Sequence, residues 1–349
     1  MLLGLVACAQ PSTTTTAAPP SERVAIVVAE RGEHGLHLVG IDESGDRQFE
    51  LVRAPTVLTR DLDPAISPDG RWIVFASSRG RDFTETSLWI ARTEPDAVPT
   101  QLLPSRAGLP IESHAAWRPD SRGIVFDSTR AHGEFDLWEL AIDRRGHVVG
   151  APRQLTSAPG HEVTPTIARD GSIIYAAVSA SVGKVSSHLE RRRVDGTIEE
   201  LTPGPADASP ALSPDGTQLV FSRPAEHNGA LDSELYIMPV GEPDAAVPLV
   251  DVTLTDETGP VYSHDGRYVF ATSVLRGARG NVVFSSVIVI DLLQHPRVAR
   301  LLQDRTGPIA RITPALAPIT LDARALDAAP EYLTELARIT ASAAAAVHL

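Results

Sequence analysis

One position of a repeated motif in this chain carries an acid in five copies and an arginine in a sixth. The residues at this position, called here the acidic set, are Asp61, Glu112, Glu162, Asp207, Glu257 and Arg311. Carboxylates held close together raise one another's pKa values unless a cation or hydrogen-bond donors offset their repulsion. If the fold gathers the copies around one point, the acidic set predicts a site for a cationic group, either a metal ion or a basic peptide.

A second polar set stands two residues further along each copy. Its members, called here the inner set, are Asp63, His114, Thr164, Ser209, Gly259 and Thr313. Alternate residues of a strand point to the same face, so we expect the inner set to lie beside the acidic set. In a second interpretation, an acid at the start of a strand accepts hydrogen bonds from backbone amides of the neighbouring repeat, which requires no ligand. The spacing is compatible with both interpretations.

The motif that carries both sets ends in a hairpin signal. Five segments align without gaps and end in Asp-Gly or Asp-Ser, at 64–70, 115–121, 165–171, 210–216 and 260–266. Asp-Gly favours a tight hairpin, and a short apolar run typical of a buried strand follows each turn. Their aspartates are 45 to 51 residues apart. Four short strands per copy at this spacing predict the blades of a β-propeller.

The copies can be counted into a closed ring. The segment before the first copy supplies only three strands of a blade, and the incomplete copy at 309–318 supplies the missing first strand. We therefore predict an all-β, six-bladed β-propeller of four-stranded antiparallel blades, whose first blade is closed by a C-terminal strand. This closure, a velcro, removes two exposed sheet edges. In such a ring both polar sets encircle one mouth of the central channel.

The predicted domain boundaries follow from this arrangement. We expect the propeller at 22–320, preceded by a segment at 1–21 with a Ser/Thr/Pro tether and followed by an Ala-rich helical tail at 321–349. The predicted blades span about 22–60 together with 309–318, then 61–108, 109–158, 159–205, 206–255 and 256–305.

Details of the repeat resemble a known family. Ser-Pro-Asp-Gly turns occur at 67–70 and 213–216, Phe-x-Ser-x-Arg stretches end at Arg79 and Arg130, and the third strands contain Leu-Trp or Leu-Tyr. These features resemble the WD40-like repeats of TolB-type six-bladed β-propellers. The resemblance extends over residues 22–320 and implies a propeller that is exported across the inner membrane.

Cys8 is the only cysteine in the sequence, which excludes an internal disulfide. Residues 5–8, Leu-Val-Ala-Cys, resemble the lipobox of bacterial lipoproteins, and the Ser, Thr and Pro residues of 11–20 resemble an extended tether. We therefore predict that residues 1–21 are a lipoprotein signal remnant and tether, with lipidation at Cys8 and the true start codon upstream. The predicted location is the periplasmic face of the bacterial cell envelope, with the outer membrane favoured because Ala9, not Asp, follows the cysteine. The alternative is an ordinary apolar N-terminus with a chance cysteine.

The overall composition narrows the function classes. The net charge of -13 disfavours nucleic-acid binding, which needs a basic surface. The sequence contains no Gly-x-Ser-x-Gly, His-Glu-x-x-His or Walker-type motif. The favoured function is non-catalytic binding of a protein or peptide, with basic peptides among the candidates, through one face or the channel mouth of a monomeric, lipid-anchored propeller without cofactor. The alternative is a metal-assisted lyase-like or cyclase-like enzyme that uses the acids and His114 with a divalent cation.

Overall fold

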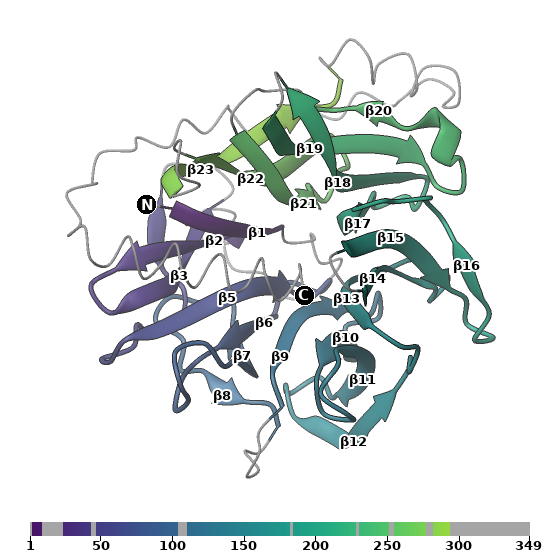
Figure 1. The fold of residues 1–349 in the computed structure, drawn as a ribbon. Helices are drawn as coiled ribbons and strands as arrows, with labels where there is room; N and C mark the ends of the chain where they lie inside the picture. Colours follow the sequence, from purple (N-terminus) through teal and green to yellow (C-terminus); the bar gives the residue numbers. More distant parts are fainter. Residues whose placement is uncertain are drawn as a thin grey trace.

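The computed structural model describes residues 2–8, 24–42, 47–103, 110–181, 184–227, 230–250, 255–276 and 282–293. In this part of the chain the strands form five sheets around a common centre, as Figure 1 shows, and the first sheet, of eight strands, contains two blades. The other four sheets are one blade each, which confirms the predicted all-β propeller. No helix in these ranges is long and apolar enough to cross a membrane.

The blades follow one another in sequence order. Blade one contains β1 (Leu2–Cys8), β2 (Val24–Gly32), β3 (Gly35–Asp42) and β4 (Gln48–Glu50). Blade two contains β5 (Thr59–Ile66), β6 (Trp72–Ser77), β7 (Ser87–Arg92) and β8 (Thr100–Gln101). Blade three contains β9 (Glu112–Trp117), β10 (Gly123–Ser128), β11 (Asp136–Ile142) and β12 (Val148–Gln154).

The second half of the ring repeats this plan. Blade four contains β13 (His161–Ile167), β14 (Ile173–Ser181), β15 (Lys184–Arg192) and β16 (Ile198–Glu200). Blade five contains β17 (Ala208–Leu212), β18 (Gln218–His227), β19 (Ala230–Pro239) and β20 (Val247–Pro248), with a 3-10 turn at η2 (Pro243–Ala245). Blade six contains β21 (Thr255–Tyr262), β22 (Tyr268–Arg276) and β23 (Val282–Asp291). Blades one and two are joined by a short parallel contact between β3 and β5.

The hydrophobic core lies between adjacent blades. The second strands of blades two to six each bury an aromatic side chain to within 1% of full burial: Phe75, Phe126, Tyr175, Phe221 and Phe270. One core cluster combines Val74 and Leu88 of blade two with Ile124 and Leu140 of blade three. Because each sheet packs against a sheet on both sides, its second strand has no solvent-facing side, which explains the apolar runs in the sequence.

The hairpin turns form where the sequence places Asp-Gly. Gly70 has φ 71°, a left-handed conformation that glycine adopts without a steric penalty. The carboxylate of Asp69 accepts hydrogen bonds from the Ser67 hydroxyl at 2.7 Å and from the Arg71 amide at 3.2 Å. The aspartates of these turns therefore fix the chain reversal.

The closure of blade one differs from the prediction. β1 pairs antiparallel with β2, with Cys8 opposite Ile26 and Val6 opposite Val28, so the N-terminal segment holds the innermost position of this blade. The free edge of β2 offers backbone groups to any extended segment that reaches it, and Leu2–Cys8 satisfies them. The predicted closing strand at 309–318 and the predicted tail at 321–349 lie outside the described residues.

Candidate functional site

A bulge interrupts the innermost strand of every blade from two to six. In β5, for example, Leu62 pairs with Ala76 and Ala65 pairs with Val74, so two residues oppose one. The first residue of each bulge has a left-handed backbone: Asp63 (φ 50°), His114 (φ 43°), Thr164 (φ 53°), Ser209 (φ 50°) and Gly259 (φ 59°). These are the members of the inner set that the structure describes. A non-glycine residue in this conformation costs about 1–3 kcal/mol, so four blades hold a strained residue at the same place.

The five bulges line one cavity at the centre of the ring. Its volume is about 1570 Å³, and it is lined by Asp63, His114, Thr164, Ser209, Gly259 and the residues that flank them. Proline follows four of the five bulge residues, at positions 64, 165, 210 and 260. The walls therefore combine apolar rings and aliphatic side chains with hydroxyl groups and a small number of charges.

The acidic set lies elsewhere. Asp61, Glu112, Glu162, Asp207 and Glu257 are at most 3% exposed, and none of the five lines the cavity. The bulge breaks the alternation of side chains along the strand, so a residue of the inner set no longer shares a face with the acid two positions before it. The ring of carboxylates at the channel mouth that the sequence predicted is therefore absent from the described residues. Arg311 and Thr313 lie outside them.

Contacts within and between blades satisfy most of the buried acids. Asp61 accepts hydrogen bonds from Ser77 at 2.6 Å and from Arg79 at 2.5 Å. Glu112 pairs with Arg130 and also accepts a hydrogen bond from the backbone amide of Leu88 in blade two, at 3.1 Å. The remaining contacts are those of Asp207 with Arg223 at 2.7 Å and of Glu257 with Ser273 at 2.8 Å. These side chains connect strands within a blade, and Glu112 also connects two blades. Its hydrogen bond with the Leu88 amide is the contact with a neighbouring repeat that the second interpretation of the sequence predicted.

Glu162 has neither a serine nor an arginine to hold it. The positions equivalent to the serine and arginine that hold Asp61 are Ala177 and Ser179. Its Oε2 is buried without a hydrogen-bond partner among the described residues. Burial, reinforced by the negative charge of neighbouring carboxylates such as Asp136, raises the pKa of Glu162 to about 7. The interface between blades three and four therefore contains a carboxyl group that titrates near neutral pH.

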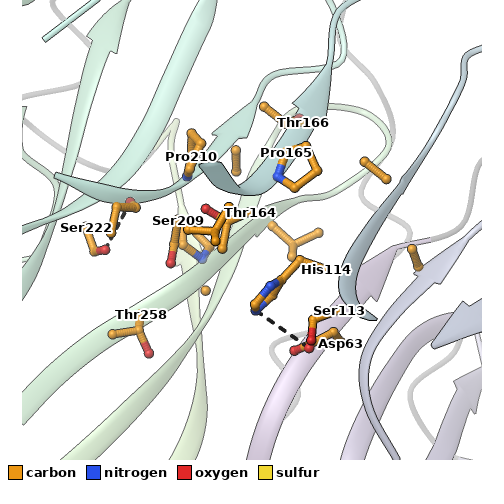
Figure 2. A pocket seen from close by; sticks show the side chains of 18 of the residues that line it. Asp63, Ser113, His114, Thr164, Pro165, Thr166, Ser209, Pro210, Ser222 and Thr258 are labelled. Atoms are coloured by element: carbon orange, nitrogen blue, oxygen red, sulfur yellow. Dashed lines mark hydrogen bonds and ion pairs between the residues drawn. The ribbon is translucent and has the colours of Figure 1, made fainter. Parts of the chain in front are cut away.

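A polar cluster projects into the cavity from blades two and three. Nδ1 of His114 lies 2.8 Å from Oδ2 of Asp127, and Nε2 lies 3.6 Å from Oδ2 of Asp63. Figure 2 shows His114 between Asp63 and Thr164, with Ser209 on the next strand. Asp127 is wholly buried, and its Oδ2 also accepts a hydrogen bond from the backbone amide of Thr164 at 3.0 Å. Asp63, His114 and Asp127, called here the channel cluster, thus link three blades.

The two carboxylates of the channel cluster keep His114 charged. Burial alone lowers the pKa of His114, but the charges of Asp127 and Asp63 and the hydrogen bond to Asp127 outweigh it and raise the pKa to about 10. Burial raises the pKa of Asp63, while the positive charges of His114 and Arg60 act in the opposite direction. At neutral pH the cluster is therefore an imidazolium held between two acids.

Asp127 was not singled out by the sequence analysis. It belongs to a second strand, where its structural equivalents are Ala76, Ala176, Ser222 and Thr272. The other blades have a small or hydroxyl-bearing residue at this position. An acid that stands there in one blade alone is the signal that could have identified Asp127. Asp127 differs from its equivalents in the other blades, so it is not part of the pattern that the copies of the repeat share.

Two further predictions concern the lipidation residue Cys8 and a metal ion. Cys8 is the last residue of β1. In the described ranges, no group of three or more His, Cys, Asp and Glu side chains is placed to hold a metal ion. A divalent cation at the channel mouth and the metal-assisted enzyme stay predictions.

Curated proteins with similar sequences match only part of the chain. The uncharacterized peptidase YuxL of Bacillus subtilis (strain 168) is 25% identical over an alignment of 205 residues, and the match covers 48% of this chain and 30% of that protein. The uncharacterized protein Atu1656 of Agrobacterium fabrum is 29% identical over 180 residues, 51% of this chain and 56% of that protein. The chain thus spans about half or less of the length of these relatives. No protein-family model matches it.

Solved structures match a larger part of the chain. A protein assigned as TolB from Agrobacterium tumefaciens superposes with a TM-score of 0.53 at 20% identity, covering 71% of this chain and 82% of that one. TolB from Acinetobacter baumannii gives a TM-score of 0.53 at 16% identity, covering 78% of this chain and 64% of that one. Together with the arrangement of the strands into blades around one centre, these similarities show that the chain has a TolB-like β-propeller fold.

Proposed function

We propose that this propeller is a non-catalytic binding protein that takes a segment of a protein or peptide into its central cavity. The observation that carries the proposal is the cavity itself, about 1570 Å³ in volume and lined by equivalent bulges of five blades. Pockets for small molecules usually measure about 300–1,000 Å³. A larger cavity at the centre of a ring suits a longer, extended ligand.

The chemistry of the walls supports a peptide ligand. Pro165 and Pro210 give the wall apolar surface, while Ser209 and Thr258 offer hydroxyl groups. This mixture of apolar surface with a few polar groups fits side chains of different kinds along one bound segment.

A channel-filling variant tests the proposal. Thr258 lines the cavity and has an ordinary backbone conformation, so Thr258→Trp reduces the space available to a ligand. Val149 lies 55% exposed in β12, outside the cavity lining, so Val149→Trp is the matched control. The immobilised full chain and both variants are incubated with an envelope extract and with its proteolytic digest, and bound components are identified by mass spectrometry. We expect components retained by the wild type and by Val149→Trp to be lost from Thr258→Trp. Equal sets from all three proteins would contradict binding in the cavity.

The proposal includes attachment to the cell envelope through a lipid at Cys8. Its support is the lipobox-like sequence of residues 5–8 followed by the Ser/Thr/Pro-rich segment. Cleavage before Cys8 would remove most of β1, because that strand spans Leu2–Cys8. The mature lipoprotein and the pairing of β1 with β2 are thus mutually exclusive.

Metabolic labelling separates these two states. Cells that express the chain are labelled with a palmitate analogue, and the intact mass of the purified protein is measured. We expect a labelled species that begins at Cys8 and partitions into detergent, and an unlabelled, soluble Cys8→Ser variant. An unlabelled wild-type protein that retains residues 2–7 would favour β1 as a permanent strand of blade one.

A further inference from the structure

The channel cluster breaks the repetition of the fold. Features that hold a blade together recur from blade to blade, as the buried aromatic residues and the bulges do. Among blades two to six, only blade three has an acid at the position of Asp127. His114 is the only histidine at a bulge position of these blades. The fold therefore does not require these residues, and their place in the cavity wall suggests that they serve a ligand.

Two buried acceptor atoms of this wall have no partner. Oδ1 of Asp127 and Oγ1 of Thr164 are both inaccessible to solvent and accept no hydrogen bond from the described residues. A buried acceptor without a donor costs about 1–3 kcal/mol, and a carboxylate oxygen costs more than a hydroxyl. The other oxygen of Asp127 already accepts two hydrogen bonds, from His114 and from the amide of Thr164. The wall thus lacks N–H donors on one side of Asp127.

The surrounding charges decide which donor fits. His114 donates to Oδ2 of Asp127, and the positive charges of His114 and Arg60 act on Asp63, so Oδ1 of Asp127 still lacks a donor. Hydrogen bonds from a charged donor to a carboxylate are about twice as strong as those between neutral groups. Leu62, Pro64 and Val163 flank the cluster and also line the cavity. They provide an apolar path for an aliphatic stem.

We propose that the channel cluster, together with Thr164, binds the primary ammonium group of a lysine side chain. Asp127 and Thr164 both line the cavity, and a rotation of their side chains exposes Oδ1 and Oγ1 to the ammonium, which donates to both atoms. Its methylene stem packs on the apolar residues beside the cluster. This proposal rests on the proposed binding of a peptide in the cavity and names the residue of the peptide that is recognised. Blades two to four thereby give the ring one specific side, and the rest of the cavity wall accepts the peptide less selectively.

A small probe tests the ammonium site separately from peptide capture. Binding of Nα-acetyl-lysine methylamide to the full chain is measured by NMR titration. The matched probe carries an additional acetyl group on Nε, which removes the charge and two of the three N–H donors. We expect the charged probe to bind about tenfold or more tightly than its acetylated analogue, because a charge-assisted hydrogen bond is worth roughly 1.5–3 kcal/mol. Equal binding of the two probes, or no binding of either, overturns the proposal.

Variants locate the site. Asp127→Asn and Thr164→Val each remove part of the acceptor set and are expected to reduce the preference for the charged probe to about twofold or less. Glu94→Gln is the control, because Glu94 is exposed, outside the cavity lining, and the change removes the same charge. Circular dichroism establishes which variants fold, and Thr164→Val decides the outcome if Asp127→Asn does not. A preference retained by the folded variants, or lost equally in Glu94→Gln, overturns the assignment.

The outcomes distinguish this proposal from the broader one. If Thr258→Trp loses its captured peptides while the ammonium probe shows no preference, the cavity binds peptides without a lysine site. If the probe binds selectively and capture is unchanged by Thr258→Trp, the ammonium site stands and the peptide function fails.

Discussion

Arg223 holds both carboxylate oxygens of Asp207, with Nε 2.7 Å from Oδ1 and Nη2 2.8 Å from Oδ2. Asp207 is wholly buried, so loss of the guanidinium leaves an uncompensated charge inside the protein. We expect Arg223→Met, which keeps most of the aliphatic stem, to lower the free energy of unfolding by about 3–5 kcal/mol. Urea denaturation at neutral pH measures this change.

An exposed pair provides the matched control for that variant. Arg53 and Asp96 also form an ion pair, at 3.1 Å, but their side chains are 58% and 63% exposed. Arg53→Met is expected to cost about 1 kcal/mol or less, because water screens the pair. Similar losses for Arg53→Met and Arg223→Met would show that burial of the Asp207 pair has no special weight.

Glu162 predicts a stability that falls as the pH rises. Its pKa is about 7 in the folded protein and 4.5 as the ordinary value, so the folded state binds more protons between these limits. The stabilisation by the proton is fully present below about pH 4.5 and is lost as the pH rises through about 7. At pH 8 the ionised carboxylate costs about 3 kcal/mol. Glu162→Gln should therefore raise the free energy of unfolding at pH 8 and have little effect at pH 4.5.

Urea denaturation of both proteins at the two pH values checks this prediction. Glu94→Gln removes an exposed carboxylate and serves as the control for the loss of charge. A difference between Glu162→Gln and the wild type that is the same at pH 4.5 and pH 8 would exclude titration of Glu162 as its cause.

His114 is expected to stay protonated well above neutral pH. Its pKa of about 10 results from Asp127 and Asp63, which outweigh the opposing effect of burial. The free energy that protonation of His114 contributes to folding is complete below about pH 6.5 and is lost as the pH rises through about 10. In 15N NMR spectra the imidazole should keep the chemical shifts of the cation at pH 8. Asp127→Asn should lower this pKa by about one unit or more, and a neutral His114 at pH 8 in the wild type would refute the assignment.

The left-handed bulge residues predict that a glycine introduced at one bulge stabilises the fold and that a glycine removed from another destabilises it. Ser209 has φ 50°, whereas the equivalent residue of blade six is Gly259. We expect Ser209→Gly to raise the free energy of unfolding by about 0.5–1 kcal/mol and Gly259→Ser to lower it by a similar amount, because a side chain disfavours this conformation. Thermal denaturation measures both changes.

Ser113 is the control for these glycine substitutions, since it precedes a bulge in β9 and its φ is not positive. Ser113→Gly should be destabilising by about 0.5–1 kcal/mol. A stabilising effect at Ser113 equal to that at Ser209 would argue against relief of backbone strain.

The fold could be predicted from the sequence because its signals repeat. The Asp-Gly turns and the apolar second strands occur in copy after copy, and each turn and strand lies where the spacing placed it. One strand does not follow this logic. The innermost place of blade one depends on which of two segments reaches the edge of β2, and Leu2–Cys8 carries none of the repeat motif.

The candidate site was less predictable because a bulge changes the direction of side chains. Strict alternation places Asp61 and Asp63 on one face, but the left-handed residue at position 63 separates a buried acid from one in the cavity wall. The sequence does carry a signal of this change, because proline follows the bulge residue in four of the five blades, as Pro64 follows Asp63. Asp127 was missed for a different reason, since alignment of repeats emphasises what the copies share.

The buried acids differ in the partners that compensate them, and this difference affects how cooperatively the ring unfolds. A closed ring unfolds as one unit only if every interface between blades resists opening equally, and local opening begins where the free energy is smallest. In neutral to alkaline solution the interface that contains Glu162 loses its proton while the interface of Asp61 keeps its arginine. The amides of β13 and β14 should then exchange hydrogen before those of β5 and β6, and the ring acquires a preferred point of opening that acid removes.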